Sequence, residues 1–107
     1  MALTNDLEHL LNLAKRKLSV AVLTVLYEGP LRYSKLHHAV SQVSPDVVHA
    51  RTLTDTLTYL RAHDLVEHHQ GDDRADYRLT DGGVELVDLL GEIERWGRQH
   101  RASGDRT

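Results

Sequence analysis

The chain has 107 residues, of which 40% are hydrophobic and 27% are charged, so we expect one globular domain with a single modest core. The absence of cysteine excludes disulfides, thiolate metal sites and thiol redox switches. No apolar run approaches the roughly 20 residues that span a bilayer, and the N-terminus lacks a signal-peptide pattern. We therefore expect a soluble, cytoplasmic protein.

The formal net charge is −3, but the charges are unevenly distributed along the chain. Residues 15–61 hold seven Lys or Arg against three acids, a balance of +4, whereas residues 64–94 hold two against ten, a balance of −8. Residues from 95 onward return to +3. This segregation favours one basic surface on an acidic body, although small acidic domains also show it by chance.

A first helix is predicted from an apolar stripe that ends near Lys15. Asn5 and Glu8 form a capping-box-like pair at its start. The stripe consists of Leu3, Leu7, Leu10, Leu11 and Ala14. The basic cluster at 15–17 breaks the pattern and is interpreted as a connection, with its charges facing either solvent or phosphate.

A second helix is predicted over residues 18–28, and its apolar residues on most sides make it a central one. Gly29 suits a left-handed helix end, and Pro30 prevents the helix from continuing. Residues 31–33 are expected to form a short extended piece.

A third helix is predicted to begin with Ser34 as its cap. Its apolar residues, expected to face the core, are Leu36, Ala39 and Val40. Its polar residues, expected to face outward, are Lys35, His37 and His38.

The segment 41–50 leaves two alternatives open. Ser44, Pro45 and Asp46 have the form of a helix start, with a capping hydroxyl, Pro at the first position and an acid in the first turn. Either the next helix begins at Pro45 and is unusually long, or a short extra turn precedes it. The apolar spacing favours one continuous helix.

The segment 51–67 contains the predicted helix around which the rest of the chain is organised. Leu53, Leu57 and Leu60 recur at spacings of four and three, which places them on one helix face. The opposite face is polar and rich in hydroxyls, and consists of Arg51, Thr52, Thr54, Asp55, Thr58 and Tyr59. Two strands are predicted next, at 65–70 and 75–79. A polar-faced helix that leads into a hairpin is typical of a winged helix-turn-helix.

A last helix is predicted to start with Thr80 as its cap and Asp81 in its first turn, and to reach His100. The pair Gly82 and Gly83 is expected to weaken that start by about 1 kcal/mol per Gly. The predicted fold is thus mainly α with a small β wing, in the order α-α-β-α-α-β-β-α. It forms one domain over residues 1–101, with a polar, disordered tail at 102–107.

Four segments carry a resemblance to a known family: VLTVLYEGPLRYSKLHHAV, RTLTDTLTYLRAHDLVEH, YRLTDGG and LLGEIERWGRQH. With them the sequence resembles the HxlR-type winged helix-turn-helix transcriptional regulators of bacteria, from about Leu7 to Arg101. The pair Trp96 and Gly97 near the end of the last helix is a specific feature. The chain departs from the family pattern in an insertion around 43–49, in an acidic wing and in having KRKL at 15–18.

The resemblance implies a dimer that binds a pseudo-palindromic operator in double-stranded DNA, with no enzymatic activity and no cofactor. It places the dimer interface on the first and last helices. The apolar residues of those helices exceed what one small core can bury, which favours the same interface. The expected interface residues are Leu3, Leu7, Leu10, Leu11, Leu86, Leu89, Leu90, Ile93 and Trp96.

In a helix-turn-helix, the N-terminal part of the recognition helix meets base edges in the major groove. The residues expected there are Arg51, Thr52, Thr54, Asp55 and Thr58. Asp55 either accepts from a cytosine amino group or orients Arg51. The start of the third helix suits a backbone phosphate, through Arg32, Tyr33, Ser34 and Lys35. Tyr33 could equally pack against the core. In the wing, Arg74 is the best candidate, although acidic neighbours oppose it.

Other classes of function have little support. The eight histidines are not arranged as a chelate, so surface histidines are expected rather than a metal site. No nucleophile or phosphate-loop motif is present. The second hypothesis is a winged-helix module for protein interaction with weak or no DNA binding. The sequence allows a small-molecule effector but identifies none.

Overall fold

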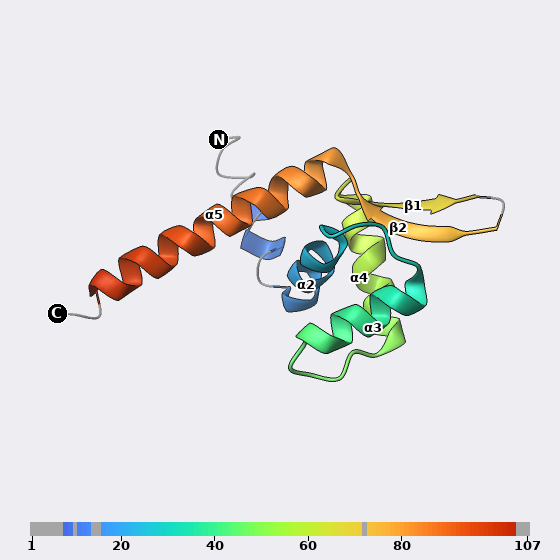
Figure 1. Cartoon of the computed structure of the whole chain (residues 1–107), viewed down its shortest axis with the longest axis horizontal. Coiled ribbons are helices and arrows are strands. Elements are labelled where there is room, and N and C mark those ends of the chain that lie inside the picture. Colours follow the sequence, from blue (N-terminus) through green and yellow to red (C-terminus); the bar gives the residue numbers. More distant parts are fainter. Residues whose placement is uncertain (1–7, 10, 14–15, 72, 105–107) are drawn as a thin grey trace.

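The computed structural model describes residues 8–9, 11–13, 16–71 and 73–104. For residues 102–104 it describes the backbone only. Residues 8–9 and 11–13 are helical, whereas Leu3, Asn5, Leu7 and Leu10 of the predicted first helix lie outside the described residues. The elements that follow (Figure 1) are α2 (Lys17–Leu26), α3 (Tyr33–Val43), α4 (Ala50–Ala62), β1 (Val66–Gln70), β2 (Ala75–Leu79) and α5 (Asp81–Gly104).

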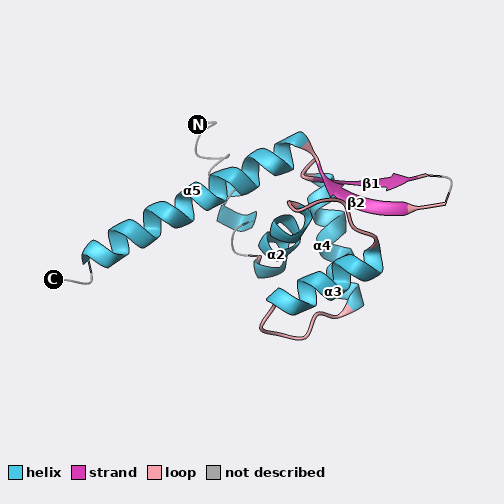
Figure 2. Cartoon of the chain, in the orientation of Figure 1, coloured by secondary structure: helices cyan, strands magenta, loops and turns pink. Residues whose placement is uncertain are grey.

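The molecule is mainly helical with an antiparallel two-stranded wing (Figure 2), as the sequence predicts. The helices α2, α3 and α4 form the body, the wing projects from one side of it, and α5 extends beyond it on the other (Figure 1). The principal extents of 57 × 35 × 22 Å reflect these two projections. In the described part of the chain, no helix combines the length and apolar character needed to cross a membrane.

The core lies where α2, α3 and α4 meet. Leu53, Leu57 and Leu60 of α4 are buried, which confirms the face predicted from their spacing. Full burial of such a side chain contributes about 1.5–3 kcal/mol. The buried residues that α2 and α3 contribute are Val22, Leu23, Leu26, Leu36 and Val40. Burial of one face of α4 fixes the opposite face outward.

The connection between α2 and α3 is tied to the wing. The backbone N–H of Leu31 donates to the carbonyl of Tyr77 at 3.0 Å, and the N–H of Tyr77 donates back at 2.8 Å. The extended piece predicted at residues 31–33 is thus present at Leu31 as an isolated bridge, whereas Tyr33 already belongs to α3. The helix α2 ends at Leu26, with Tyr27 as its C-cap, two residues before the predicted end at residue 28. Gly29 follows with a φ of +148°, which only glycine adopts readily.

The segment between α3 and α4 differs from the prediction, because no helix starts at Pro45. Ser44 is extended (φ −85°, ψ 136°), as is usual for the residue before a proline, and α3 ends at Val43. The chain bends at residues 45–46, Val48 packs into the core, and His49 follows as the extended N-cap of α4. Burial of Val48 therefore overrides the local helix-start signal.

The start of α3 also differs from the prediction. Arg32 is the N-cap, and Ser34 lies inside the first turn without a capping hydrogen bond. The first turn is closed by the N–H of Leu36, which donates to the Arg32 carbonyl at 2.8 Å. Tyr33 becomes helical because its ring packs against the core and its hydroxyl is hydrogen-bonded to α4.

The wing pairs Val66 with Leu79 and Gln70 with Ala75 at its two ends. Thr80 caps α5 as predicted, because the N–H of Gly83 donates to its hydroxyl oxygen at 3.0 Å. The Thr80 hydroxyl in turn donates to the carbonyl of Asp64 at 2.6 Å. The helix α5 continues past the predicted end at His100 to Gly104.

Gly83 has a role that its helix propensity does not suggest. A Cβ added there would collide with the backbone carbonyl of Leu65. At Gly82, by contrast, the same addition meets only ordinary van der Waals contacts, at 3.7 Å and beyond. Gly83 therefore lets α5 approach the backbone before β1 closely.

A second contact attaches α5 to the body. The hydroxyl of Tyr27, just after α2, donates to the carboxylate of Asp88 at 2.5 Å. This hydrogen bond and the charge of Asp88 raise the pKa of Tyr27 above its ordinary value. Half-buried Leu86 and Val87 also pack against the core, so the first part of α5 is held in place.

Candidate nucleic-acid interface

The outer face of α4 is polar and exposed. Arg51, Thr52, Thr54, Asp55 and Thr58 are all exposed, as predicted. No ion pair or hydrogen bond joins Arg51 to Asp55 within the described residues, so the predicted orienting pair is not formed. The guanidinium at the start of this helix is therefore available to a ligand.

Hydrogen bonds within the protein decide what the hydroxyls of this face can offer. The Thr58 hydroxyl donates to the carbonyl of Thr54 at 3.0 Å, so its oxygen is left as an acceptor. The Tyr33 hydroxyl donates to the carbonyl of Ala50 at 3.0 Å and lies 3.3 Å from the hydroxyl of Thr54. Since Tyr33 has one proton, Thr54 supplies the proton of the second bond. Both threonines therefore present acceptors to a ligand.

Two side chains of α3 hold the start of α4. Of the two predicted roles of Tyr33, DNA contact and core packing, the structure has the second: its ring is half-buried against the core and its hydroxyl is hydrogen-bonded to α4. His37 was predicted to face outward, but it is half-buried, and its Nε2 lies 2.7 Å from the carbonyl oxygen of Val48. The two rings are parallel, with centroids 6.3 Å apart. Their spacing of four residues puts them on one helix face, but the sequence does not show what that face meets.

Tyr59 also differs from the prediction of an outward side chain. It is half-buried and packs against the core, and the guanidinium of Arg16 lies 3.9 Å from its ring centroid. His63 lies on the same ring, at 4.4 Å between centroids. Arg16 of the basic cluster thus packs against α4, a role that the sequence does not reveal.

The start of α3 carries Arg32, Ser34 and Lys35, all exposed. Neither Arg32 nor Lys35 has an ion-pair partner among the described residues, and the first turn of α3 contains no acid. The hydrogen bond from Tyr33 to Ala50 places this turn beside the start of α4. The cations of the two helix starts therefore share one region of the surface.

The negative charge of the wing is partly neutralised by an ion pair within it. Arg78 forms a double hydrogen bond with the carboxylate of Asp76, at 2.9 Å to each oxygen, so these charges compensate one another. Arg74 is exposed near the tip and has no ion-pair partner within the described residues. Asp73 remains beside it, and residue 72 lies outside the described residues.

This arrangement matches a known family. The model of the HxlR-like helix-turn-helix matches residues 13–105, most of the chain. The chain belongs to the HxlR-like helix-turn-helix family. Members of this family are DNA-binding transcriptional regulators and not enzymes. No curated protein sequence matches the chain at a significant level.

Solved structures of transcriptional regulators share the fold of this chain. The reduced form of the transcriptional regulator YodB from B. subtilis is 22% identical, with a TM-score of 0.76, and the match covers 88% of this chain and 90% of YodB. Quinone-bound YodB matches with a TM-score of 0.72, at 22% identity over 88% of this chain and 96% of that one. The transcriptional repressor BigR from Xylella fastidiosa is 25% identical, with a TM-score of 0.69, over 84% of each chain.

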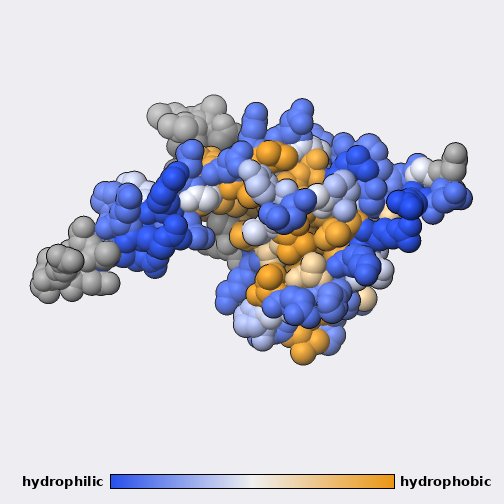
Figure 3. Space-filling view, in the orientation of Figure 1, coloured by the Kyte–Doolittle hydropathy of each residue, from blue (hydrophilic) through white to orange (hydrophobic). Residues whose placement is uncertain are grey.

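The last helix of this HxlR-like chain carries an exposed apolar stripe. Leu89, Ile93 and Trp96 are 43%, 50% and 61% exposed, and Leu11 of the first helical segment is 52% exposed. Leu90 is half-buried. The far half of α5 is hydrophilic on the face seen in Figure 3, and apolar residues gather over the body. The predicted interface residues Leu3, Leu7 and Leu10 lie outside the described residues.

The histidine pairs do not form a chelate. His68 stacks on Tyr77 with centroids 4.3 Å apart, whereas His69 lies 2.6 Å from the carboxylate of Glu67. Within the described residues, no group of three or more potential ligands could hold a metal ion.

Proposed function

We propose that this chain is a dimeric, sequence-specific regulator that reads double-stranded DNA with α4 in the major groove. The observation that carries the proposal is the orientation of α4. Its three leucines are buried, so Arg51 and the hydroxyls point outward at the helix start, where a recognition helix meets base edges. The cations at the start of α3 lie beside them.

The residues divide into specifying and positioning groups. Arg51 has the fork that binds both acceptors of a guanine edge. Thr54 and Thr58, with their protons already donated, accept from the amino group of an adenine or a cytosine. Asp55 accepts from a cytosine amino group. Arg32 and Lys35 hold a backbone phosphate, with Ser34 and the free N–H groups of the α3 start.

The dimer forms through the exposed stripe of α5 and the first helix. Leu89, Ile93 and Trp96 recur at spacings of four and three, so they form one stripe. An exposed apolar stripe of this kind marks an interface. Two copies related by a two-fold axis present two α4 helices, which suits a pseudo-palindromic operator.

The regulatory role that we infer is a cytoplasmic repressor or autoregulator. The experiment is a titration of the protein with a duplex from its own promoter region and with a scrambled duplex, at two salt concentrations. Specific binding that weakens steeply with salt supports the proposal, since each neutralised phosphate adds about 0.9 to the salt slope. Equal binding to both duplexes contradicts sequence-specific reading.

A module for protein interaction is the second candidate, and Asp55 is the observation that favours it. Its carboxylate is exposed in the middle of the reading face, with no ion-pair partner among the described residues, and it repels phosphate. Asp55→Asn separates the two candidates. If Asp55 reads DNA, the change raises affinity for scrambled duplex and lowers preference for the operator. An interaction module shows no operator binding with either residue.

A further inference from the structure

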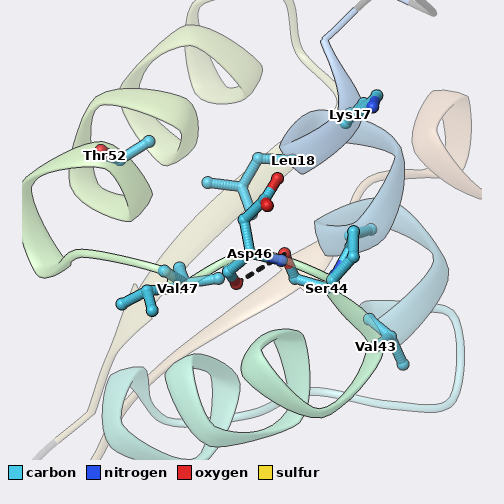
Figure 4. A pocket seen from close by; sticks show the side chains of 10 residues that line it. Lys17, Leu18, Val43, Ser44, Asp46, Val47 and Thr52 are labelled. Carbon is cyan, nitrogen blue, oxygen red and sulfur yellow. Dashed lines mark hydrogen bonds between the residues drawn. The ribbon is translucent and has the colours of Figure 1, made fainter.

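The connection between α3 and α4 is longer than a helix-turn-helix requires. It covers residues 44–49, six residues, whereas the usual turn between these helices has about 3–4. The additional length does not form a helix, and it borders a pocket of about 230 Å³ against α2 that is open to solvent on one side (Figure 4). Residues from the first half of α2, the last residue of α3 and Thr52 of α4 complete the walls.

The walls of this pocket are mainly apolar. They consist of Leu18, Ala21, Val43, Pro45, Val47 and Val48. Two of these side chains are exposed at its edge, Val43 at 61% and Val47 at 80%. Exposed aliphatic side chains at the edge of a pocket lose contact with water when an apolar group enters it, which favours binding. An engineered apolar cavity of about 150 Å³ holds a benzene ring, so this pocket has room for a single ring or a branched chain.

Polar groups of opposite charge lie on the same pocket. Lys17 and Asp46 both line it, together with Ser44 and Thr52 (Figure 4). Lys17 and Asp46 do not form an ion pair with one another, nor with any other described residue. A ligand that carries both an anionic and a cationic group complements both side chains.

We propose that this pocket binds a small amphipathic zwitterion, an α-amino acid with a single-ring or branched aliphatic side chain. The side chain of the ligand lies against the valines and Leu18. Its carboxylate meets the ammonium group of Lys17, and its ammonium group meets the carboxylate of Asp46. The Ser44 hydroxyl donates to the carbonyl of Asp46 at 3.0 Å and accepts from its N–H at 3.3 Å, so it fixes the backbone that carries the Asp46 carboxylate.

The pocket gives such a ligand a route to the reading helix. The connection runs directly from Val48 through His49 into Ala50, and Thr52 of α4 lies in the pocket wall. A ligand that fixes the connection therefore changes the position or mobility of the α4 start. This consequence for DNA affinity rests on the proposed function, whereas binding of the ligand does not.

The test uses L-phenylalanine with two analogues that each lack one charge, phenethylamine and 3-phenylpropanoate. Each is titrated into the protein without DNA, and amide chemical shifts of the residues around the pocket are followed. We expect L-phenylalanine to bind with a Kd on the order of 1 mM and each analogue about two- to fivefold more weakly. Shifts that do not saturate, or that occur away from the pocket, would overturn the proposal.

Variants test each charge separately. Lys17→Gln weakens binding of L-phenylalanine and of 3-phenylpropanoate but not of phenethylamine. Asp46→Asn weakens L-phenylalanine and phenethylamine but not 3-phenylpropanoate. If neither variant shows this reciprocal pattern, the zwitterion is the wrong ligand class.

The apolar part is tested by Ala21→Leu, which fills the pocket and weakens all three compounds. Because Ala21 also packs against the core, Val47→Thr serves as a second variant at an exposed position of the same size. Unchanged affinity in both variants would show that the compounds bind elsewhere. Since DNA is absent, these results stand whether or not α4 reads an operator.

Discussion

The Nε2 of His37 lies 2.7 Å from the carbonyl oxygen of Val48, and it donates to that oxygen in the tautomer that carries its proton on Nε2. This bond joins the middle of α3 to the connection that leads into α4. Val48 is itself buried, at 8% exposure, so its carbonyl depends on a partner within the protein. His37 therefore positions the reading helix without facing DNA.

We predict that His37→Ala destabilises the fold by about 1 kcal/mol, because it leaves the Val48 carbonyl without its donor. It should also weaken operator binding without changing the salt slope, because His37 contacts no phosphate. Thermal unfolding and salt-dependent DNA titrations measure these effects. His38→Ala, at an exposed position of the same helix, is the matched control, and equal behaviour of the two variants would contradict the role of His37.

The two glycines at the start of α5 should respond differently to substitution. Gly83→Ala forces a side chain against the Leu65 carbonyl and should cost about 1–3 kcal/mol. Gly82→Ala has room for its methyl group and should be neutral or stabilise the helix by up to about 1 kcal/mol. Denaturant unfolding of both variants gives the comparison. A Gly83→Ala protein as stable as the parent would show that the close approach to Leu65 is not required.

The sequence predicted those parts of the fold that depend on local periodicity. The spacing of Leu53, Leu57 and Leu60 predicted the buried face of α4, and Thr80 was recognised as a cap from its own neighbourhood. The favoured prediction, a helix that starts at Pro45, was wrong, because α4 starts at Ala50. Burial of Val48, a tertiary contact, overrides the helix-start signal at Pro45.

The same limit applies to the candidate site. The exposed residues of α4 were predicted, since exposure follows from the position of the leucines. The sequence left Tyr33 open between DNA contact and core packing, and it predicted an outward His37. Their hydrogen bonds to Ala50 and Val48 could not be predicted, because these partners are distant along the chain. The contact of Arg16 with Tyr59 spans even more of the sequence. Helical spacing alone cannot show which face of α3 meets the connection.

We predict that Trp96→Ala, and more strongly Ile93→Asp, shift the protein from dimer towards monomer. Both residues lie on the exposed stripe of α5, and neither is needed by the core of one chain. Sedimentation at micromolar concentration measures the change, with exposed Arg95→Ala as the control on the same helix. A parent protein that is monomeric under these conditions would remove the basis for the dimer.

Peroxide or a quinone should leave DNA affinity unchanged under mild conditions. The chain has no cysteine, and Met1 is its single methionine, so no thiol can form a disulfide or an adduct. The measurement is an operator titration before and after treatment, with reductant added afterwards. A loss of operator binding after treatment that the reductant reverses would contradict this prediction.

The most direct test of DNA reading by α4 compares Arg51→Ala with Lys35→Ala against operator and scrambled duplex over a range of salt. If Arg51 binds a guanine edge, its loss costs about 1–3 kcal/mol on the operator and relaxes preference at one base pair. If Lys35 binds phosphate, its loss weakens all sequences alike and lowers the salt slope by about one unit. If both variants bind both duplexes as the parent does, α4 is not the reading element.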